Sequence, residues 1–407
     1  MSNRTKVFVL ASSTVLLILV ALGTLGVRAA SKDDGAYRQL QVYSEVLSRV
    51  RNEYVEEPNV PAVTDGALHG LLEALDANSS YLSPAEYKEY KSHKLSAKAD
   101  IGATISKRFG YAAVVAVIPG GPADKANIQS GDIFEAIEGK STHEMSLAEI
   151  HGKLMGDVGS NVNVSVVRAS ARRSEPQKAT LTRDLPINPA VLEKSLEDNT
   201  GYVKVEFFSK GKSQEIANHV KALQHNGAKK LILDLRNCAD GDINEGIATA
   251  NLFLDHGTIA YLQGQKYPRE NFNADPQKEI TKLPLVVLVN RGTAGPAEVV
   301  AAAILENSRG DLVGDKTFGV GSVQKVIEIP DGSALILSIA KYYTPGGKAI
   351  QDSAVTPNVL VADEDDSAPV DEEEAAPPDQ EPKKAPSQQD EQLHRALEVL
   401  KARVAKG

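Results

Sequence analysis

Two stretches in the second half of the chain have the turn and loop patterns in which proteins often present reactive groups. Residues 285–305 read as a buried strand, a turn of sequence RGTAGPAE at 291–298, and the start of a helix. Residues 314–324 follow as a loop of sequence GDKTFGVGSVQ. Hydrolysis on such a turn and loop needs an oxygen nucleophile, a neutral amine that takes its proton, and N–H donors for the developing oxyanion.

The order of these segments resembles the carboxyl-terminal processing (tail-specific) peptidases, a family of serine peptidases with a Ser/Lys dyad. In that family the turn reads roughly Gly-Ser-Ala-Ser-Ala-Ser-Glu, and the later loop reads Thr-Phe-Gly-Lys-Gly-Ser-Val-Gln. The resemblance places the nucleophile at Gly295 and the lysine base at Val320, which are 25 residues apart, as the two are in the family. The glutamine of the family's loop falls on Gln324.

The resemblance extends over nearly the whole chain. Residues 42–54, 66–75 and 76–84 are similar to the family's amino-terminal helices and their Leu-Asp-Pro-His-Ser-Ser-Tyr signature. Residues 100–183 resemble its PDZ domain, and residues 234–237 resemble the end of the strand that leads into its Asn-Pro-Gly-Gly loop. The resemblance therefore implies a multidomain α/β (α+β) protein, with a PDZ domain and a spiral of strands backed by helices.

The residues at the family's catalytic positions lack the groups that the reaction needs. Gly295 has no side chain, and Val320 has no atom that accepts a proton. Pro296 has no backbone N–H, although that N–H is one oxyanion donor in the family. At the other oxyanion position, Gly241, the preceding Asp240 replaces a glycine and brings a negative charge toward a site for an anion. We expect no intact catalytic site, because losing one dyad member already costs several orders of magnitude in rate.

Substitute catalytic groups are few. Thr293 and Ser322 each lie two residues from an expected catalytic position, and both read as ordinary turn residues. Lys316 lies about 13 Å from the expected base position if the loop is extended. Cys238 has no adjacent histidine or lysine and is expected to pack as a small apolar residue. The 8 histidines show no metal-ligand spacing, so we expect neither a metal nor a cofactor.

The PDZ region retains more of its binding elements. A PDZ domain binds a peptide carboxylate with loop N–H groups, and the peptide adds as a strand beside a helix. Asp100 takes a glycine position in this loop, which predicts a weaker affinity for carboxylates. The groove helix is expected at residues 145–155. The predicted peptide-binding residues are Asp100, Ile101, Gly102 and Ala103 of the loop, and Leu147, Ile150, His151 and Leu154 of the helix, some of which would otherwise simply pack inside the domain.

Charge and the single cysteine exclude several functions. The formal net charge is −9, and residues 363–391, with 12 acidic residues and 2 lysines, carry −10 of it, so the rest of the chain sums to about +1. Such a body has no basic stripe for nucleic acid. One cysteine excludes an internal disulfide and a cysteine-based metal cluster.

The amino terminus predicts export. Arg4 and Lys6 precede an uncharged, mostly apolar run of 21 residues that begins at Val7 and ends at Val27, long enough to span a bilayer. With the basic residues inside, the body faces the periplasm or another extracytoplasmic space. A cleaved signal peptide with its site at residues 27–29 or 28–30 is the alternative, and would release the protein. The length of the run favours an uncleaved anchor.

The remaining patterns divide the chain into six regions. Residues 202–207, 213–225 and 231–235 alternate strand, helix and strand, which indicates an α/β core. Residues 363–389 are acidic and proline-rich and predict a disordered linker. The expected regions are a leader at 1–30, a helical region at 36–97, a PDZ domain at 98–183, a peptidase-like core at 184–362, the linker at 363–389, and a final helix at 390–407 that docks on the core or on a partner.

Three functions follow from the sequence. The first is a pseudopeptidase that binds the carboxyl-terminal tails of exported proteins, or that regulates an active relative. The second is an active peptidase that cuts near carboxyl ends with unorthodox residues. The third is a structural scaffold of the cell envelope whose contacts come from the linker and last helix. Gly295, Pro296 and Val320 argue against the second, and the retained loop at 101–103 argues against the third.

Overall fold

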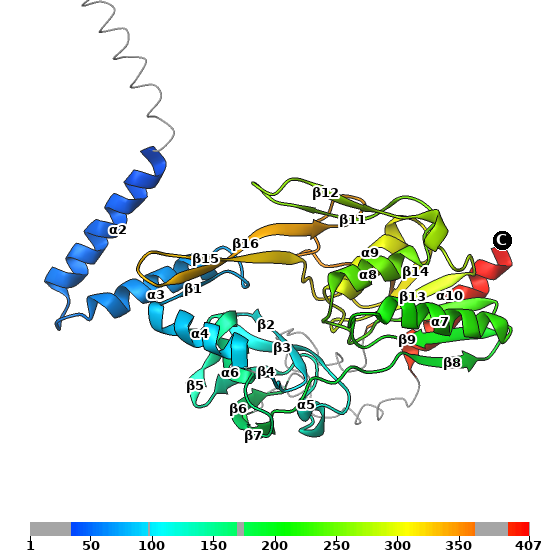
Figure 1. The fold of residues 1–407 in the computed structure, drawn as a ribbon, viewed down its shortest axis with the longest axis horizontal. Helices are drawn as coiled ribbons and strands as arrows, with labels where there is room; N and C mark the ends of the chain where they lie inside the picture. The colour runs from blue at the N-terminus through cyan, green and yellow to red at the C-terminus, as the bar shows by residue number, and fades with distance from the viewer. Residues whose placement is uncertain (1–33, 97, 169–174, 363–389, 407) are drawn as a thin grey trace, which may run out of the picture. The chain divides into compact units, whose positions relative to one another are not determined.

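The computed structural model describes residues 34–96, 98–168, 175–362 and 390–406 (Figure 1). Residues 1–67 and 68–407 are separate compact units. The predicted leader at 1–30 and the predicted linker at 363–389 lie outside the described residues. Among the residues that are described, no helix is both long and apolar enough to span a bilayer.

The amino-terminal region contains the helices expected there. Helix α2 spans Asp34–Glu53, and α3, Val60–Glu73, begins in the first unit and ends in the second. On the outer surface of α2, Arg49 forms ion pairs with Glu45 and Glu53 at (i, i+4) spacing.

Residues 76–96 connect this region to a long strand of the core. Helix α4 is Pro84–Ser96, and the Glu86 side chain accepts a 2.7 Å hydrogen bond from the Ser83 N–H, as expected for a helix that starts at Pro84. The short strand β1, Ser80–Leu82, interrupts the predicted helices and pairs antiparallel with β16, Ala334–Tyr343. The Asp76 carboxylate accepts from Ser79 N and from Ser338 Oγ of β16, which fixes the same junction.

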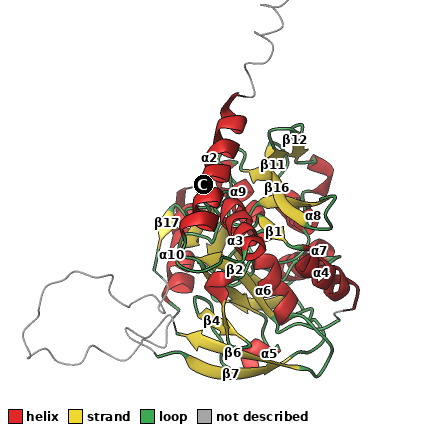
Figure 2. Ribbon diagram, turned by 90° about the vertical axis from the view of Figure 1, so that its left-hand side faces the viewer, coloured by secondary structure: helices red, strands yellow, loops and turns green. Residues whose placement is uncertain are grey.

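The PDZ domain contains a six-stranded sheet, in which five strands follow the order β2-β3-β4-β6-β7 and β5 pairs with β4. Figure 2 labels β2, β4, β6 and β7 of this sheet. Ser146 and Glu149 form a reciprocal capping box, so the groove helix begins at Leu147 rather than at the expected Met145. The elements of the domain are β2, Ala103–Arg108; β3, Tyr111–Val117; α5, Pro122–Lys125; β4, Ile133–Ile137; β5, Lys140–Ser141; α6, Leu147–Leu154; β6, Asn161–Val167; and β7, Gln177–Thr182.

The core contains a six-stranded sheet in the order β17-β14-β13-β10-β9-β8, parallel except between β8 and β9. Buried strands such as LVVLV at β13 read as continuous apolar runs because both faces of the sheet are covered. The elements are β8, Leu192–Leu196; β9, Thr200–Lys204; α7, Lys212–His225; β10, Lys230–Asp234; α8, Ile243–Asn251; β13, Leu285–Val289; α9, Pro296–Glu306; β14, Asp311–Gly314; and β17, Val359–Leu360.

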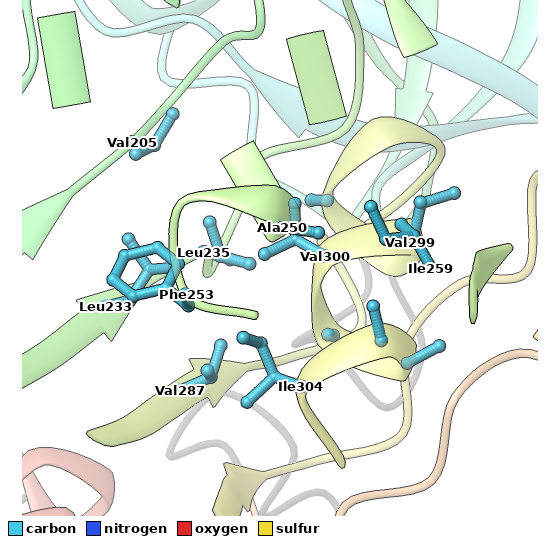
Figure 3. Close-up of a cluster of buried hydrophobic side chains, with 14 of the residues drawn as sticks. Val205, Leu233, Leu235, Ala250, Phe253, Ile259, Val287, Val299, Val300 and Ile304 are labelled. Atoms are coloured by element: carbon cyan, nitrogen blue, oxygen red, sulfur yellow. The ribbon is translucent and has the colours of Figure 1, made fainter. Parts of the chain in front are cut away.

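Alternate residues of each strand face opposite sides of this sheet. Leu233 and Val287 pack with α7, α8 and α9, and Figure 3 shows Ile304 of α9 directed toward them. The neighbouring residues Ile232 and Val286 pack instead against α10, Glu391–Lys406. The last helix therefore packs on the core, and the bidentate ion pair between Arg236 and Asp390 holds its first turn there.

A second sheet in the core carries the loop of the expected base. It has the order β1-β16-β11-β12, with β15 on the other edge of β16. Its remaining strands are β11, Thr258–Gln263; β12, Glu270–Asn273; and β15, Ser322–Glu328. Because β15 begins immediately after the loop at 315–321, its pairing with β16 fixes the carboxyl end of that loop.

A buried carboxylate joins this loop to the start of α9. Glu298 is fully buried, and its two oxygens accept hydrogen bonds from four donors: Gly295 N at 3.0 Å, Gly319 N at 2.8 Å, Val320 N at 2.8 Å, and the Thr317 hydroxyl. Burial nevertheless outweighs these donors and raises the pKa of Glu298 to about 7. The two loops that hold the catalytic positions are thus connected by one side chain.

The raised pKa of Glu298 predicts a pH-dependent stability. The ordinary value is 4.5, so between pH 4.5 and about 7 the folded chain binds a proton that the unfolded chain releases. Stability should therefore fall as pH rises through that window, by about 3 kcal/mol. The measurement is urea unfolding at a series of pH values for the wild type and Glu298→Gln, which has no such proton. The difference between their free energies of unfolding should change by that amount, and parallel pH profiles would contradict this role of Glu298.

Candidate functional site

Three loops meet where the resemblance places a catalytic centre. The first follows β10 and carries Asp240 and Gly241, the second joins β13 to α9, and the third precedes β15. Backbone bonds connect them, since Ala294 N donates to Cys238 O at 2.9 Å and Phe318 N donates to Thr293 O at 2.9 Å. The structure therefore brings together the expected nucleophile, base and oxyanion positions.

Gly295 occupies the sharp turn between β13 and α9. Its φ of 56° and ψ of −118° favour glycine, because an L side chain at this φ is strained. Space is not the obstacle, since a Cβ built on Gly295 would meet its nearest neighbour, Ala239 O, at 3.7 Å. Pro296 is the first residue of α9 and is buried, so no N–H is available there. The turn keeps its geometry but holds no nucleophile.

The remaining oxyanion donor already has a carboxylate partner. Gly241 N donates to Oδ1 of the preceding Asp240 at 2.6 Å. The Asp240 side chain keeps contact with solvent while protein atoms crowd around it. This desolvation and the like charge of Asp100 raise the pKa of Asp240, while the bond from Gly241 opposes the shift. The Asp240 carboxylate thus accepts from the N–H at the position where the resemblance places an oxyanion donor.

The expected base position has become part of an apolar contact. Val320 and Phe318 pack against a buried cluster of Val115, Ala116, Ala239 and Ala294. Val115 and Ala116 belong to β3 of the PDZ domain, whereas the other members belong to the three core loops. The Arg108 guanidinium also lies 5.6 Å from the centroid of the Phe318 ring. The PDZ domain therefore packs directly on the loops that carry Gly295 and Val320.

The residues that could substitute for the missing nucleophile or base are hydrogen-bonded, buried or exposed to solvent. Thr293 is fully buried, and its Oγ1 donates to Leu235 O and accepts from Asn290 N, so its hydroxyl completes the turn. Ser322 Oγ accepts from the side chains of Asn78 and Gln324. Burial raises the pKa of the Cys238 thiol, which makes the thiolate scarce. Lys316 is exposed on its loop.

Gln324 is the residue type that the resemblance expects at this position, and its side-chain amide contacts two serine hydroxyls. Its Nε2 donates to Ser322 Oγ at 2.7 Å and to Ser338 Oγ at 3.4 Å, within the β15–β16 ladder. No group of three or more histidine, cysteine or acidic residues in the described ranges has the geometry for a metal ion.

The PDZ loop and helix lie as a groove requires, but several predicted groove residues face inward. Ile101, Ile150 and Leu154 are part of the buried core of the domain, and Leu147 is also buried. His151 is exposed, and its Nε2 lies 3.1 Å from the carbonyl oxygen of Ile105 in β2. Asp100 and Gly102 form the loop before β2, and Ala103 begins that strand.

The sequence reasoning assigned no role to Glu298 or to the PDZ surface at Val115 and Ala116. Glu298 had a signal, because it is the one acidic residue in an otherwise apolar helix start, AEVVAAAIL. A charged group in such a run is rarely buried unless it is hydrogen-bonded. The contact of β3 with the loops joins residues far apart in sequence, and no local pattern indicates it.

Comparisons with known proteins agree with the fold. Residues 199–361 match Peptidase family S41, and residues 114–168 match the PDZ domain. The chain is 31% identical over 353 residues to carboxy-terminal processing protease CtpA of Bacillus subtilis (strain 168), covering 86% of this chain and 74% of that protein. It is 33% identical over 321 residues to the carboxyl-terminal-processing protease of Synechocystis sp. (strain ATCC 27184 / PCC 6803 / Kazusa), covering 77% and 74%.

A solved structure supports the same family assignment. The photosystem II D1 C-terminal processing protease superposes with a TM-score of 0.65 at 26% identity, covering 79% of this chain and 92% of that one. Sequence and fold agree over most of the chain. The chain belongs to the carboxyl-terminal processing peptidases of family S41.

Proposed function

We propose that the chain is a pseudopeptidase of this family, which binds peptide segments at the tails of exported proteins through its PDZ domain, or docks on an active relative and regulates it. The observation that carries the proposal is the bond from Gly241 N to the Asp240 carboxylate, next to a turn that has Gly295 and Pro296. A peptidase needs that donor free for the substrate oxyanion.

Three further features support loss of catalysis. Gly295 offers no nucleophile, and the hydroxyl of Thr293 is consumed by the turn itself. Val320 packs against the PDZ domain, so the base position contributes an apolar contact instead of an amine. Gly295 is itself buried, and the preceding Ala294 is a member of that contact. The positions expected to hold the nucleophile, the base and the oxyanion donors therefore hold residues that contribute to the fold and not to catalysis.

Peptide binding is supported by the edge of the PDZ sheet. Strand β2 lies at the end of the sheet and pairs with β3 on one side only. Helix α6 lies beside it, as the contact between His151 and Ile105 shows. An edge strand next to a helix is the arrangement to which peptides add as an extra strand.

We also propose that the body works outside the cytoplasm, held by an uncleaved anchor at residues 7–27. The support is the basic pair Arg4 and Lys6 before an uncharged run long enough to cross a bilayer. Protease added to intact spheroplasts should digest the body of the membrane-bound chain, and a body protected from that protease would contradict the orientation.

The first prediction is the absence of peptidase activity. Because nucleophile, base and free oxyanion donor are missing, the purified protein should neither degrade an unfolded protein nor react with a fluorophosphonate probe. The matched variants are Ser322→Ala and Thr293→Val, which remove the two nearby hydroxyls. Turnover or probe labelling by the wild type would contradict the prediction, and a probe adduct mapped to Ser322 or Thr293 would show that an unorthodox nucleophile is at work.

The second prediction concerns repair of the site. Gly295→Ser with Val320→Lys restores the dyad, although the serine adopts a strained backbone that costs about 1–3 kcal/mol. Pro296 and Asp240 still remove both oxyanion donors, so this double variant should be nearly inactive. Adding Pro296→Ala and Asp240→Gly should raise the rate at least about 10²-fold, since one donor is worth about 10²–10³.

The readouts are cleavage of an unfolded reporter and phosphonate labelling at position 295, at equal folded concentration. The phosphonate is small, so it also reports a site that the PDZ domain covers. A folded quadruple variant that neither cleaves the reporter nor takes the label would contradict the assignment of these four positions.

A further inference from the structure

The loop that would receive a peptide carboxylate already holds one. In a PDZ domain the backbone N–H groups of this loop bind the free carboxylate of the ligand. Here Gly102 N donates to Oδ1 of Asp100 at 2.8 Å. An N–H that has a charged acceptor gains little from a second one, so this loop donor is lost to a ligand.

The backbone of the loop around Asp100 is held on both sides by hydrogen bonds. Asp100 N donates to Asp184 O at 3.1 Å, and Asp184 N donates back to Asp100 O at 3.0 Å. On the other side of the loop, Ile101 O accepts from Ala123 N and Gly102 O accepts from Ile118 N, both at 2.8 Å. Because the backbone of the loop is fixed on both sides, Gly102 N stays within reach of the Asp100 carboxylate, and an incoming tail must compete with that carboxylate for the donor.

A second negative charge lies close to the loop. Asp240 of the core is near enough to Asp100 that the like charge contributes to its raised pKa, after desolvation as the larger cause. A terminal carboxylate would add a third negative charge beside these two. Like charges repel each other where protein replaces water, and the nearby His151 acts on Asp240 in the opposite direction. Both the missing donor and the local charge therefore disfavour a free carboxyl end.

The groove beside the loop keeps its other binding groups. Among the described residues, strand β2 has no strand paired on the side that faces α6. Of the contacts described along this edge, one involves a groove side chain, namely the contact between His151 Nε2 and the carbonyl oxygen of Ile105. Backbone pairing along an edge strand does not depend on the charge of the ligand's end. An extended segment can thus bind along β2 while its chain continues past the loop.

We propose that, within the tails of exported proteins, the PDZ groove selects extended segments that present no free carboxylate to the loop, namely segments upstream of the carboxyl end or chains with a neutral end, and that Asp100 sets this preference. The proposal rests on the peptide-binding function proposed above and names its ligand class. Peptides with a free carboxyl end should bind weakly, because the Asp100 carboxylate already accepts the hydrogen bond that their terminal carboxylate would accept.

The test is fluorescence polarisation of the full chain with one peptide pool in three forms. The pool consists of labelled decapeptides with randomised apolar carboxyl-terminal residues, prepared with a free end, with an amidated end, and with a polar extension after the apolar residues. The wild type should bind the amidated and extended forms at least as tightly as the free form. Asp100→Gly frees the Gly102 N–H and removes the charge, so it should favour the free form by about tenfold.

Asp100→Asn is the matched control, because it keeps the side-chain shape and a hydrogen-bond acceptor for Gly102 while removing the charge. It should bind free and amidated forms about equally, and it also serves if Asp100→Gly does not fold. A wild type that prefers the free form tenfold would overturn the role of Asp100 while supporting groove binding. No binding of any form to the wild type or to either variant would overturn groove binding itself, and this proposal with it.

Discussion

The carboxylate of Glu298 holds the centre of the molecule together. It is fully buried and receives four donors, from the turn before α9 and from the loop before β15. A buried charge of this kind is costly unless all its acceptor positions are used. Replacing or moving either loop would leave it unsatisfied, so the two loops keep their relative position although Gly295 and Val320 carry no reactive side chain.

On this fixed frame, the chain has filled its anion-binding positions from within. Asp240 accepts from Gly241 N, and Asp100 accepts from Gly102 N, each within two residues of its donor. Both bonds are local, so each aspartate reaches its donor without any change in the fold. In each loop an aspartate thus satisfies the N–H that the resemblance assigns to an external anion. At the expected base position, Val320 likewise makes an apolar contact with β3 where a lysine amine is expected in the family.

Much of this fold follows from the sequence, because its signals are local. The apolar run at β13 and the proline at the first position of α9 predict the strand, turn and helix to within a few residues. The absence of a nucleophile and a base is likewise a property of residue types. By contrast, Ile150 and Leu154 read equally well as groove or core residues, and only the three-dimensional packing assigns them to the core. The four donors to Glu298 also come from separate segments, so periodicity along the chain gives no sign of them.

The central claim is that Asp240 and Asp100 occupy the two anion-binding N–H groups, and amide proton shifts test it most directly. Glycine-selective labelling gives signals for Gly241 and Gly102, which a pH titration can follow in the wild type, Asp240→Asn and Asp100→Asn. Both amide protons should move upfield when the neighbouring carboxylate is protonated, and for Gly241 the midpoint should lie above the usual aspartate range. Each response should vanish in the matching asparagine variant. Amide shifts that stay constant through the titration of both carboxylates would contradict the account.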